Sequence, residues 1–379
     1  MNLSMLKAYK FRMYPDKEQE VQLAKTFGCC RLVYNYYLAR KIELYKSEQK
    51  SLSKYDCNNH LNRELKKSEE YIWLKEIDKF ALTNSVYNLD TAYKNFFREI
   101  KKGNKNQGFP KFKSKKINRH SYTTNFTNNN IEVDFKNNKI KLPKLRWLDC
   151  ITHREFNGQI KSCTISKTPS GKYFVSVLVE TEHSQLLQNN NAMGMDLGVS
   201  DLLITSDGEV IDNRRLTYQY EQKLAKLQRQ LAKKKKGSNN FHKQRIKVAR
   251  LHEKIANKRK DNLHKISSQI VKENQFIFSE NLNVSGMVRN HNLAKAIHDV
   301  SWYELTRQLE YKSNWNSRVY HKIDRYFPSS QLCNVCGYKN TGTKDLSVRE
   351  WICPECGSNH DRDINAAINI LNQGMKEIA

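Results

Sequence analysis

The sequence predicts an α/β fold that also carries β-barrel and helical parts. Apolar and basic residues alternate at 5–13 and again in short segments between 121 and 180, a pattern typical of strands with one solvent-facing side. Between them, from about 16 to 100, apolar residues recur with helical spacing. We therefore expect a small, mostly antiparallel barrel that the first strand joins, with the helical region as an insertion.

The second half of the chain predicts a mixed sheet covered by helices. Its first strand contains a single acid, Asp196, and a later strand ends in the carboxylate of Glu280. Asp361 is well placed to cap a last helix whose first turn contains Asp363. The expected elements are strands at 193–199 and 202–205, a basic helical pair at about 216–274, a strand at 276–282, a helix at 301–313 and a strand at 318–325.

The charge of the chain favours a polyanionic partner. Its 379 residues include 66 Lys+Arg against 39 Asp+Glu, a formal net charge of +27 spread along most of the sequence. Such an excess is expected to be neutralised by nucleic acid, because a membrane-surface protein would confine it to one amphipathic element and solubility rarely requires it. With no apolar run long enough for a membrane span or for export, we expect a cytoplasmic protein without a membrane partner.

A loop at 101–116 interleaves lysines with two phenylalanines on a backbone broken by glycine and proline. Phosphates would attract the amines, and the rings could pack on sugar or base. A solvated linker is the alternative. The residues predicted to contact nucleic acid are Lys111, Phe112, Lys113, Lys115 and Lys116.

Two Cys-x-x-Cys motifs, Cys333 with Cys336 and Cys353 with Cys356, lie near the end of the sequence. Each places two thiolates on one tight turn, and the spacer of 16 residues allows all four to surround one structural Zn²⁺. Two disulfides are the alternative, but the other cysteines show no disulfide framework. We expect those five to be ordinary small apolar residues: Cys29, Cys30, Cys57, Cys150 and Cys163.

Three acids far apart in the sequence, Asp196, Glu280 and Asp363, are expected to meet at one edge of the mixed sheet. Their repulsion would raise their pKa values unless divalent ions sat between them, and oxygen ligands without histidine favour Mg²⁺ or Mn²⁺. Two such ions could activate water and stabilise the leaving oxygen of a phosphodiester, as in a nuclease. Taken singly, each acid could instead be a helix cap or a salt-bridge partner.

Several motifs carry a resemblance to a known family. They are Lys-Ala-Tyr-Lys-Phe-Arg-Met-Tyr-Pro at 7–15, Gly-Phe-Pro-Lys-Phe-Lys at 108–113, Gly-Met-Asp-Leu-Gly-Val at 194–199, Ser-Glu-Asn-Leu at 279–282, Pro-Ser-Ser-Gln-Leu-Cys-Asn-Val-Cys-Gly at 328–337, Cys-Pro-Glu-Cys-Gly at 353–357 and His-Asp-Arg-Asp-Ile-Asn-Ala-Ala at 360–367. Together they resemble TnpB, a family of transposon-encoded RNA-guided DNA endonucleases related to type V CRISPR effectors. The likeness implies that the catalytic acids are Asp196, Glu280 and Asp363.

The resemblance also implies a domain order: a wedge-like β-barrel with a helical recognition insert, then a RuvC-like (RNase H-type) nuclease domain with an inserted zinc ribbon. A mobile segment is expected beside the active site at 289–300. The expected boundaries are 1–15 for the first barrel strand, 16–115 for the helical insert, 116–188 for the rest of the barrel, 189–328 for the nuclease domain, 329–358 for the zinc ribbon and 359–379 for the last nuclease helix.

The same resemblance implies the partners. A guide RNA from the transposon end would pair with one strand of a double-stranded target DNA, after the protein reads a short adjacent DNA motif. We expect a monomer with one RNA, linked in function to a separate transposase. Two alternatives stay open: a catalytically silent RNA-guided DNA-binding regulator, and a transposase that joins DNA strands.

Overall fold

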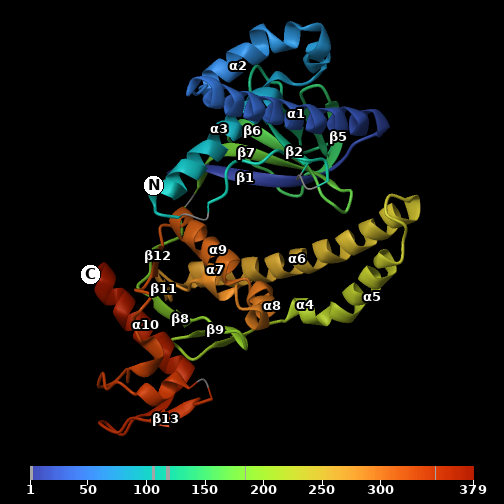
Figure 1. Cartoon of the computed structure of the whole chain (residues 1–379). Coiled ribbons are helices and arrows are strands. Elements are labelled where there is room, and N and C mark those ends of the chain that lie inside the picture. The colour runs from blue at the N-terminus through green and yellow to red at the C-terminus, as the bar shows by residue number, and fades with distance from the viewer. Residues whose placement is uncertain (1–2, 105–106, 117–119, 184, 346) are drawn as a thin grey trace. The chain divides into compact units, whose positions relative to one another are not determined.

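The computed structural model describes residues 3–104, 107–116, 120–183, 185–345 and 347–379 (Figure 1). The chain forms two compact units, an N-terminal unit of Ser4–Glu182 and a C-terminal unit of His183–Ala379. Among the described helices, none is both long and apolar enough to cross a lipid bilayer.

The N-terminal unit is built on a seven-stranded sheet in the order β2-β6-β7-β1-β5-β4-β3. The first strand lies in the middle of this sheet, where Arg12 is paired with Ile151 in an antiparallel register. Since β1 and β2 are separated in sequence by three helices, the helical region is an insertion into the sheet, as the sequence predicts. The strands are β1 (Leu3–Tyr14), β2 (His120–Asn125), β3 (Glu132–Asp134), β4 (Lys139–Leu142), β5 (Arg146–Ile151), β6 (Gln159–Lys167) and β7 (Tyr173–His183).

The inserted helices are α1 (Lys17–Glu48), α2 (Lys54–Arg63) and α3 (Lys79–Lys101), with short 3-10 turns at Leu65–Lys67 and Glu69–Glu76. A capping box formed by Asp16 and Gln19 begins α1. The Gln19 amide also donates to the carbonyl oxygens of Leu145 and Trp147, so the same residue fastens the start of the helix to β5. The five cysteines expected to be ordinary small apolar residues are all buried in this unit: Cys29, Cys30, Cys57, Cys150 and Cys163.

The C-terminal unit contains a five-stranded sheet in the order β10-β9-β8-β11-β12. The pairs β8–β9 and β9–β10 are antiparallel, whereas β8, β11 and β12 run parallel. A parallel pair needs a long crossover connection, and here the helices between β9 and β12 supply it. The strands are β8 (Ala192–Asp196), β9 (Asp201–Thr205), β10 (Val210–Asp212), β11 (Phe276–Ser279) and β12 (Val319–Lys322).

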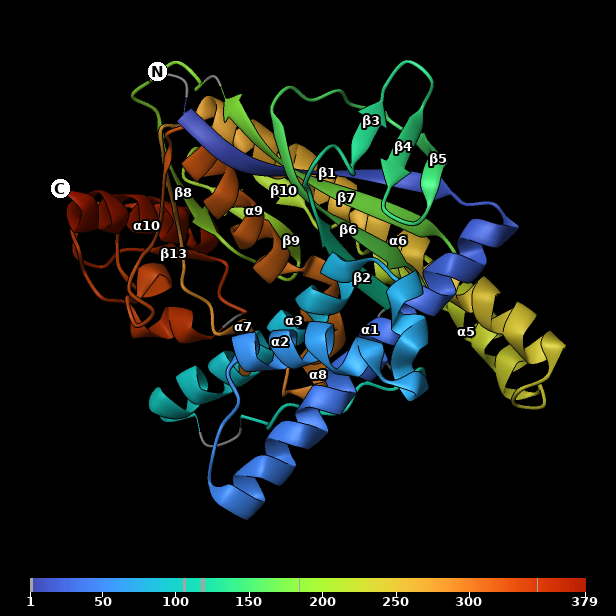
Figure 2. The ribbon, with the colours of Figure 1, turned by 90° about the horizontal axis from the view of Figure 1, so that it is seen from above.

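Between β10 and β11 the chain forms a basic helical hairpin, as the sequence predicts. Its arms are α5 (Glu221–Ala232) and the longer α6 (Asn239–Glu273), and α4 (Leu216–Gln219) precedes them. Figures 1 and 2 show the loop end of this hairpin far from the strands of its unit, and no residue of α5, all of which are described, is buried.

Three further helices follow β11, namely α7 (Val284–Met287), α8 (His291–Val300) and α9 (Trp302–Trp315). The segment at 289–300, expected to be mobile, is thus largely helical. Ile297 and Val300 of α8 are buried in the core of the C-terminal unit.

The last helix, α10 (Arg362–Ile378), packs unusually closely on the sheet (Figure 1). A Cβ at Gly194 of β8 would lie only 2.1 Å from the carbonyl oxygen of Ala367, and a Cβ at Gly374 would lie 2.1 Å from the ring of Phe278. Ala366 and Ala367 are buried beside these glycines. Small residues on both faces therefore allow the helix backbone to approach the strands.

We predict that Gly194→Ala destabilises the protein by about 1–3 kcal/mol, because the new methyl group overlaps backbone atoms that cannot rotate away. Chemical denaturation measures this change. Gly28→Ala in α1 is the matched control, since its Cβ would meet its nearest neighbour only at 3.9 Å. The control is expected to be neutral or slightly stabilising because alanine favours a helix interior. Equal midpoints for the two variants would contradict the close packing.

Candidate active site and cysteine cluster

Two of the predicted acids lie at the ends of neighbouring parallel strands. Asp196 is the last residue of β8, and Glu280 directly follows β11. The register pairs Met195 with Ser279, so the two acids follow the last paired residues side by side. Because the carboxyl ends of parallel strands meet at one edge of a sheet, the pairing itself brings these carboxylates together.

The third predicted acid, Asp363, lies in the first turn of α10. The helix is capped by Asp361, whose Oδ1 accepts from the backbone nitrogens of Asp363 and Ile364 at 2.9 Å. Asp361 is therefore used by the backbone, whereas the carboxylate of Asp363 pairs with Arg349. The carboxylate of Asp363 is close enough to Asp196 to raise its pKa.

The pKa of Asp196 is affected by both of the other acids. Burial is the largest cause that raises its pKa to about 8, followed by the charges of Glu280 and Asp363. Two nearby guanidiniums, of Arg362 and Arg349, act in the opposite direction. Burial also raises the pKa of Glu280. Without a cation between them, the three acids would not all ionise readily at neutral pH.

Three residues that the sequence did not single out contact this group. The hydroxyl of Ser329 donates to Oε1 of Glu280 at 2.7 Å, and Arg349 Nη1 lies 2.7 Å from Oδ2 of Asp363. Arg362 is largely buried, and its charge lowers the pKa of both Asp196 and Glu280. Arg362 stands inside the His-Asp-Arg-Asp motif and Ser329 inside the Pro-Ser-Ser motif, which were the available signals; Arg349 carried none.

The donor set fits divalent metal ions. Three carboxylates supply hard oxygen ligands, and the raised pKa values of Asp196 and Glu280 are what positive charge beside them would reverse. No histidine belongs to the group, which favours Mg²⁺ or Mn²⁺ over softer metals.

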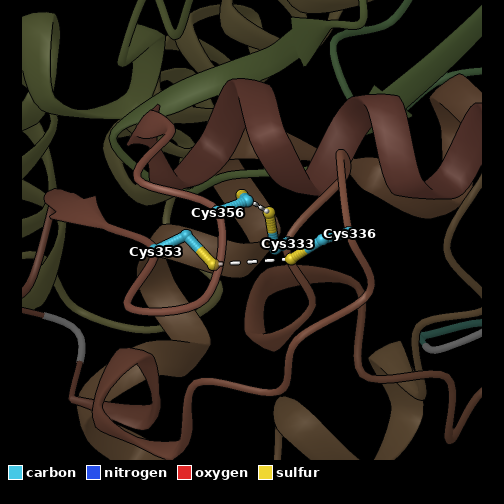
Figure 3. Close-up of side chains that lie close together, drawn as sticks. All are labelled: Cys333, Cys336, Cys353 and Cys356. Atoms are coloured by element: carbon cyan, nitrogen blue, oxygen red, sulfur yellow. Dashed lines mark hydrogen bonds between the residues drawn. The ribbon is translucent and has the colours of Figure 1, made fainter.

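The four predicted cysteine ligands form one cluster (Figure 3). Their sulfur atoms all lie within 4.8 Å of one another, with Cys333 3.6 Å from Cys356 and Cys336 3.5 Å from Cys353. A tetrahedral zinc with bonds of about 2.3 Å requires sulfur–sulfur edges of roughly 3.8 Å, so the spacing fits this ion. The cluster suggests a structural zinc site. The adjoining hairpin consists of β13 (Glu350–Ile352) and β14 (Asn359–Asp361), with 3-10 turns at Ser329–Gln331 and Thr341–Lys344.

Side chains of α10 form hydrogen bonds with the turn that contains Cys333 and Cys336, called here the first cysteine knuckle. The Asn365 amide accepts from the backbone nitrogen of Asn334 and donates to the oxygen of Leu332, and Asn369 donates to the oxygens of Leu332 and Ser329. His360 Nε2 lies 3.1 Å from the sulfur of Cys333. The helix that carries Asp363 is thus bonded directly to the cysteine cluster.

The predicted nucleic-acid loop is mostly exposed in the N-terminal unit. Lys111, Lys115 and Lys116 face solvent, and the Phe112 ring is 58% exposed. Lys113 differs, because its amine lies 3.9 Å from the centre of the Tyr34 ring. Asn35 also holds the Lys113 backbone through hydrogen bonds to its nitrogen and oxygen. Asn35 therefore positions this loop on α1.

Three family models match the chain. One described as a probable transposase matches residues 175–291, one described as a Cas12f1-like TNB domain matches 302–370, and one described as a helix-turn-helix domain matches 1–50. In the structure the last of these regions is β1 followed by the single long helix α1.

Full-length relatives agree with these models. A protein of Streptomyces pristinaespiralis named "Putative RNA-guided DNA endonuclease" is 39% identical over 97% of this chain and 89% of its own. The InsQ protein of Escherichia coli K12, named in the same way, is 34% identical over 100% of this chain and 94% of its own. A solved complex of Cas12f1 with guide RNA and target DNA shares the fold, with a TM-score of 0.61, 12% identity, and coverage of 97% of this chain and 99% of that one. The chain therefore belongs to the TnpB-like family of RNA-guided DNA endonucleases.

Proposed function

We propose that this protein hydrolyses phosphodiesters of a target DNA selected by a guide RNA, using two divalent metal ions held by Asp196, Glu280 and Asp363. The observation that carries the proposal is the convergence of three carboxylates, two at parallel strand ends and one in the first turn of α10. Three neighbouring carboxylates destabilise the fold unless cations bind between them. A two-metal nuclease requires such a set of carboxylates to hold its ions.

The surrounding residues prepare this site for chemistry. Mg²⁺ or Mn²⁺ bound there would supply an activated water and stabilise the leaving oxygen. Ser329 orients Glu280 by its hydrogen bond, and Arg362 holds positive charge beside Asp196 and Glu280 in a largely buried position. Arg349 pairs with Asp363 from an exposed position, so its guanidinium can turn from this carboxylate to a substrate phosphate.

The guide RNA and the target DNA are proposed from charge and from the relatives. A net charge of +27 suits a protein that holds a heteroduplex by its backbone and reads little sequence itself. Lys111, Phe112, Lys115 and Lys116 are proposed to contact nucleic acid from the loop that Asn35 positions. We further propose a cytoplasmic monomer with one RNA derived from the transposon end, which recognises a short target-adjacent motif and is linked in function to a separate transposase.

We predict that Asp196→Ala, Glu280→Ala and Asp363→Ala each abolish Mg²⁺-dependent cleavage of a plasmid that matches the copurified RNA, while RNA and target binding remain. Binding survives because positive residues, not the acids, hold the polyanion. Plasmid cleavage and filter binding, after sequencing of the copurified RNA, measure the two effects.

Asp361→Ala is the matched control for these variants. It removes two hydrogen bonds at the helix start, costs about 1 kcal/mol and should leave substantial cleavage. Normal cleavage by all four variants would refute the two-metal site. Wild-type protein that carries no defined RNA and instead joins element ends would favour a transposase, and RNA-guided binding without cleavage would favour a regulator.

A second prediction follows from the raised pKa of Asp196. The folded protein without metal retains a proton that the unfolded chain has released, so its stability should fall as pH rises from about 4 to about 8. Asp196→Asn removes this penalty and should make the metal-free protein more stable by a few kcal/mol at pH 8. Thermal unfolding at pH 5 and pH 8, in buffer free of Mg²⁺ and without chelator and again in Mg²⁺, measures the effect.

The Mg²⁺ stabilisation of the wild type should grow with pH over this range and should shrink in Asp196→Asn. The control is Asp207→Asn, which should behave as wild type because Asp207 is exposed. Asp299→Asn is unsuitable as a control because Asp299 pairs with Arg259. A wild-type stability that rises from pH 5 to pH 8 without Mg²⁺, with no gain in Asp196→Asn, would contradict the electrostatic account.

We also propose that Cys333, Cys336, Cys353 and Cys356 bind one structural Zn²⁺. Cys353→Ser should lower zinc content from about one per chain and reduce cleavage. Without the metal the first knuckle, with Cys333 and Cys336, is no longer held, and its hydrogen bonds to α10, the helix that carries Asp363, are weakened. Metal analysis by mass spectrometry and the plasmid assay measure the two effects. Cys57→Ser, at a cysteine outside the cluster, should keep full zinc content. Active wild-type protein without zinc would refute the assignment.

A further inference from the structure

A pocket of about 290 Å³ opens beside Glu280 and lies wholly within the C-terminal unit. Its lining includes the apolar side chains of Leu197, Leu282 and Trp302, the exposed ring of Tyr303, and the cations Lys322 and Arg325. Leu197 and Glu280 each stand next to a strand end of the candidate active site. The pocket is therefore continuous with the place where a phosphodiester would be cut.

One wall of the pocket is an aromatic platform at the start of α9. Trp302 is buried and its indole nitrogen donates to the oxygen of Gly198, so this residue is fixed to the loop that follows Asp196. The next residue, Tyr303, is 69% exposed. An exposed ring over an apolar floor is the arrangement on which an unpaired base stacks, and such stacking tolerates any base.

The lining of the pocket also carries positive charge. Arg325 Nε donates to the backbone oxygen of Asn281, the residue after Glu280, at 3.2 Å. Lys322 ends β12 and is partly buried, with its amine 5.8 Å from the centre of the Tyr320 ring. Glu280 is the single acid in the lining, and its charge would be used by metal. The pocket thus combines a stacking surface with phosphate-binding cations.

We propose that this pocket binds one nucleotide of the DNA strand being cut, with its base against Tyr303 and its phosphate on Arg325 and Lys322. The inference rests on the proposed nuclease function and names residues that would position its substrate. A base inside a duplex has both faces covered by its neighbours, so only an unpaired base of the strand could stack on Tyr303.

The test uses guide-loaded protein and a single-stranded DNA oligonucleotide matched to the guide, cut in Mg²⁺. Tyr303→Ala should raise KM on the order of tenfold with a smaller change in kcat, and Tyr303→Phe should restore the wild-type KM because stacking needs the ring and not the hydroxyl. Tyr218→Ala is the matched control, since Tyr218 is 71% exposed on α4 of the same unit and does not line the pocket.

A binding measurement separates this inference from the function on which it rests. Glu280→Gln protein, which should not cut, is mixed with DNA oligonucleotides that carry 2-aminopurine at successive positions near the cut. At one of these positions the 2-aminopurine should stack on the Tyr303 ring and lose fluorescence. This loss should disappear in the Glu280→Gln, Tyr303→Ala double variant. If the wild type is active and Tyr303→Ala changes neither KM nor the quenching, the nucleotide-binding role of the pocket is overturned and the nuclease function stands. An inactive wild type would overturn the nuclease. Quenching only with the matching RNA oligonucleotide would assign the pocket to RNA and so overturn a DNA subsite.

Discussion

The close approach of α10 to the sheet is the constraint on which the rest of the C-terminal unit depends. Gly194 and Gly374 remove side chains where the helix and strands meet, and Ala366 and Ala367 keep the helix face small. If the helix lay farther from the sheet by the width of a methyl group, Asp363 would lie outside the group that Asp196 and Glu280 form at the strand ends. The glycines are thus structural residues with a direct effect on the geometry of the site.

This geometry opposes stability in the absence of metal. Burial and the charges of Glu280 and Asp363 raise the pKa of Asp196, burial also raises the pKa of Glu280, and the arginines only partly compensate. A fold selected for stability alone would place an amide or an apolar residue at one of these positions. The conflict between local electrostatics and the global fold is the physical reason why such a site indicates function.

The elements that sequence reasoning placed correctly are those with strong local patterns. The strands around Asp196 and Glu280 are continuous apolar runs, the helical hairpin has a clear turn, and the Cys-x-x-Cys motifs fix their own geometry. The contacts of Ser329, Arg349 and Asn35 could not be predicted, because each depends on pairing between residues distant in sequence. For example, Asn35 and Lys113 meet only because α1 and the loop after α3 lie side by side. The segment at 289–300 is largely helical, with Ile297 and Val300, three residues apart, on one buried face, and its mobility stays a prediction.

The cysteine cluster acts on the acids through backbone groups rather than through its own charge. Asn365 and Asn369 of α10 bind the knuckle at Asn334, Leu332 and Ser329, and the hydroxyl of that same Ser329 reaches Glu280. One short segment between the sheet and the first cysteine therefore contacts both a strand-end acid and the helix that carries Asp363. A metal that orders this knuckle orders the two acids together, although it lies outside the reacting group. Through this coupling, an ion bound by the four cysteines would stabilise the geometry of the proposed catalytic acids.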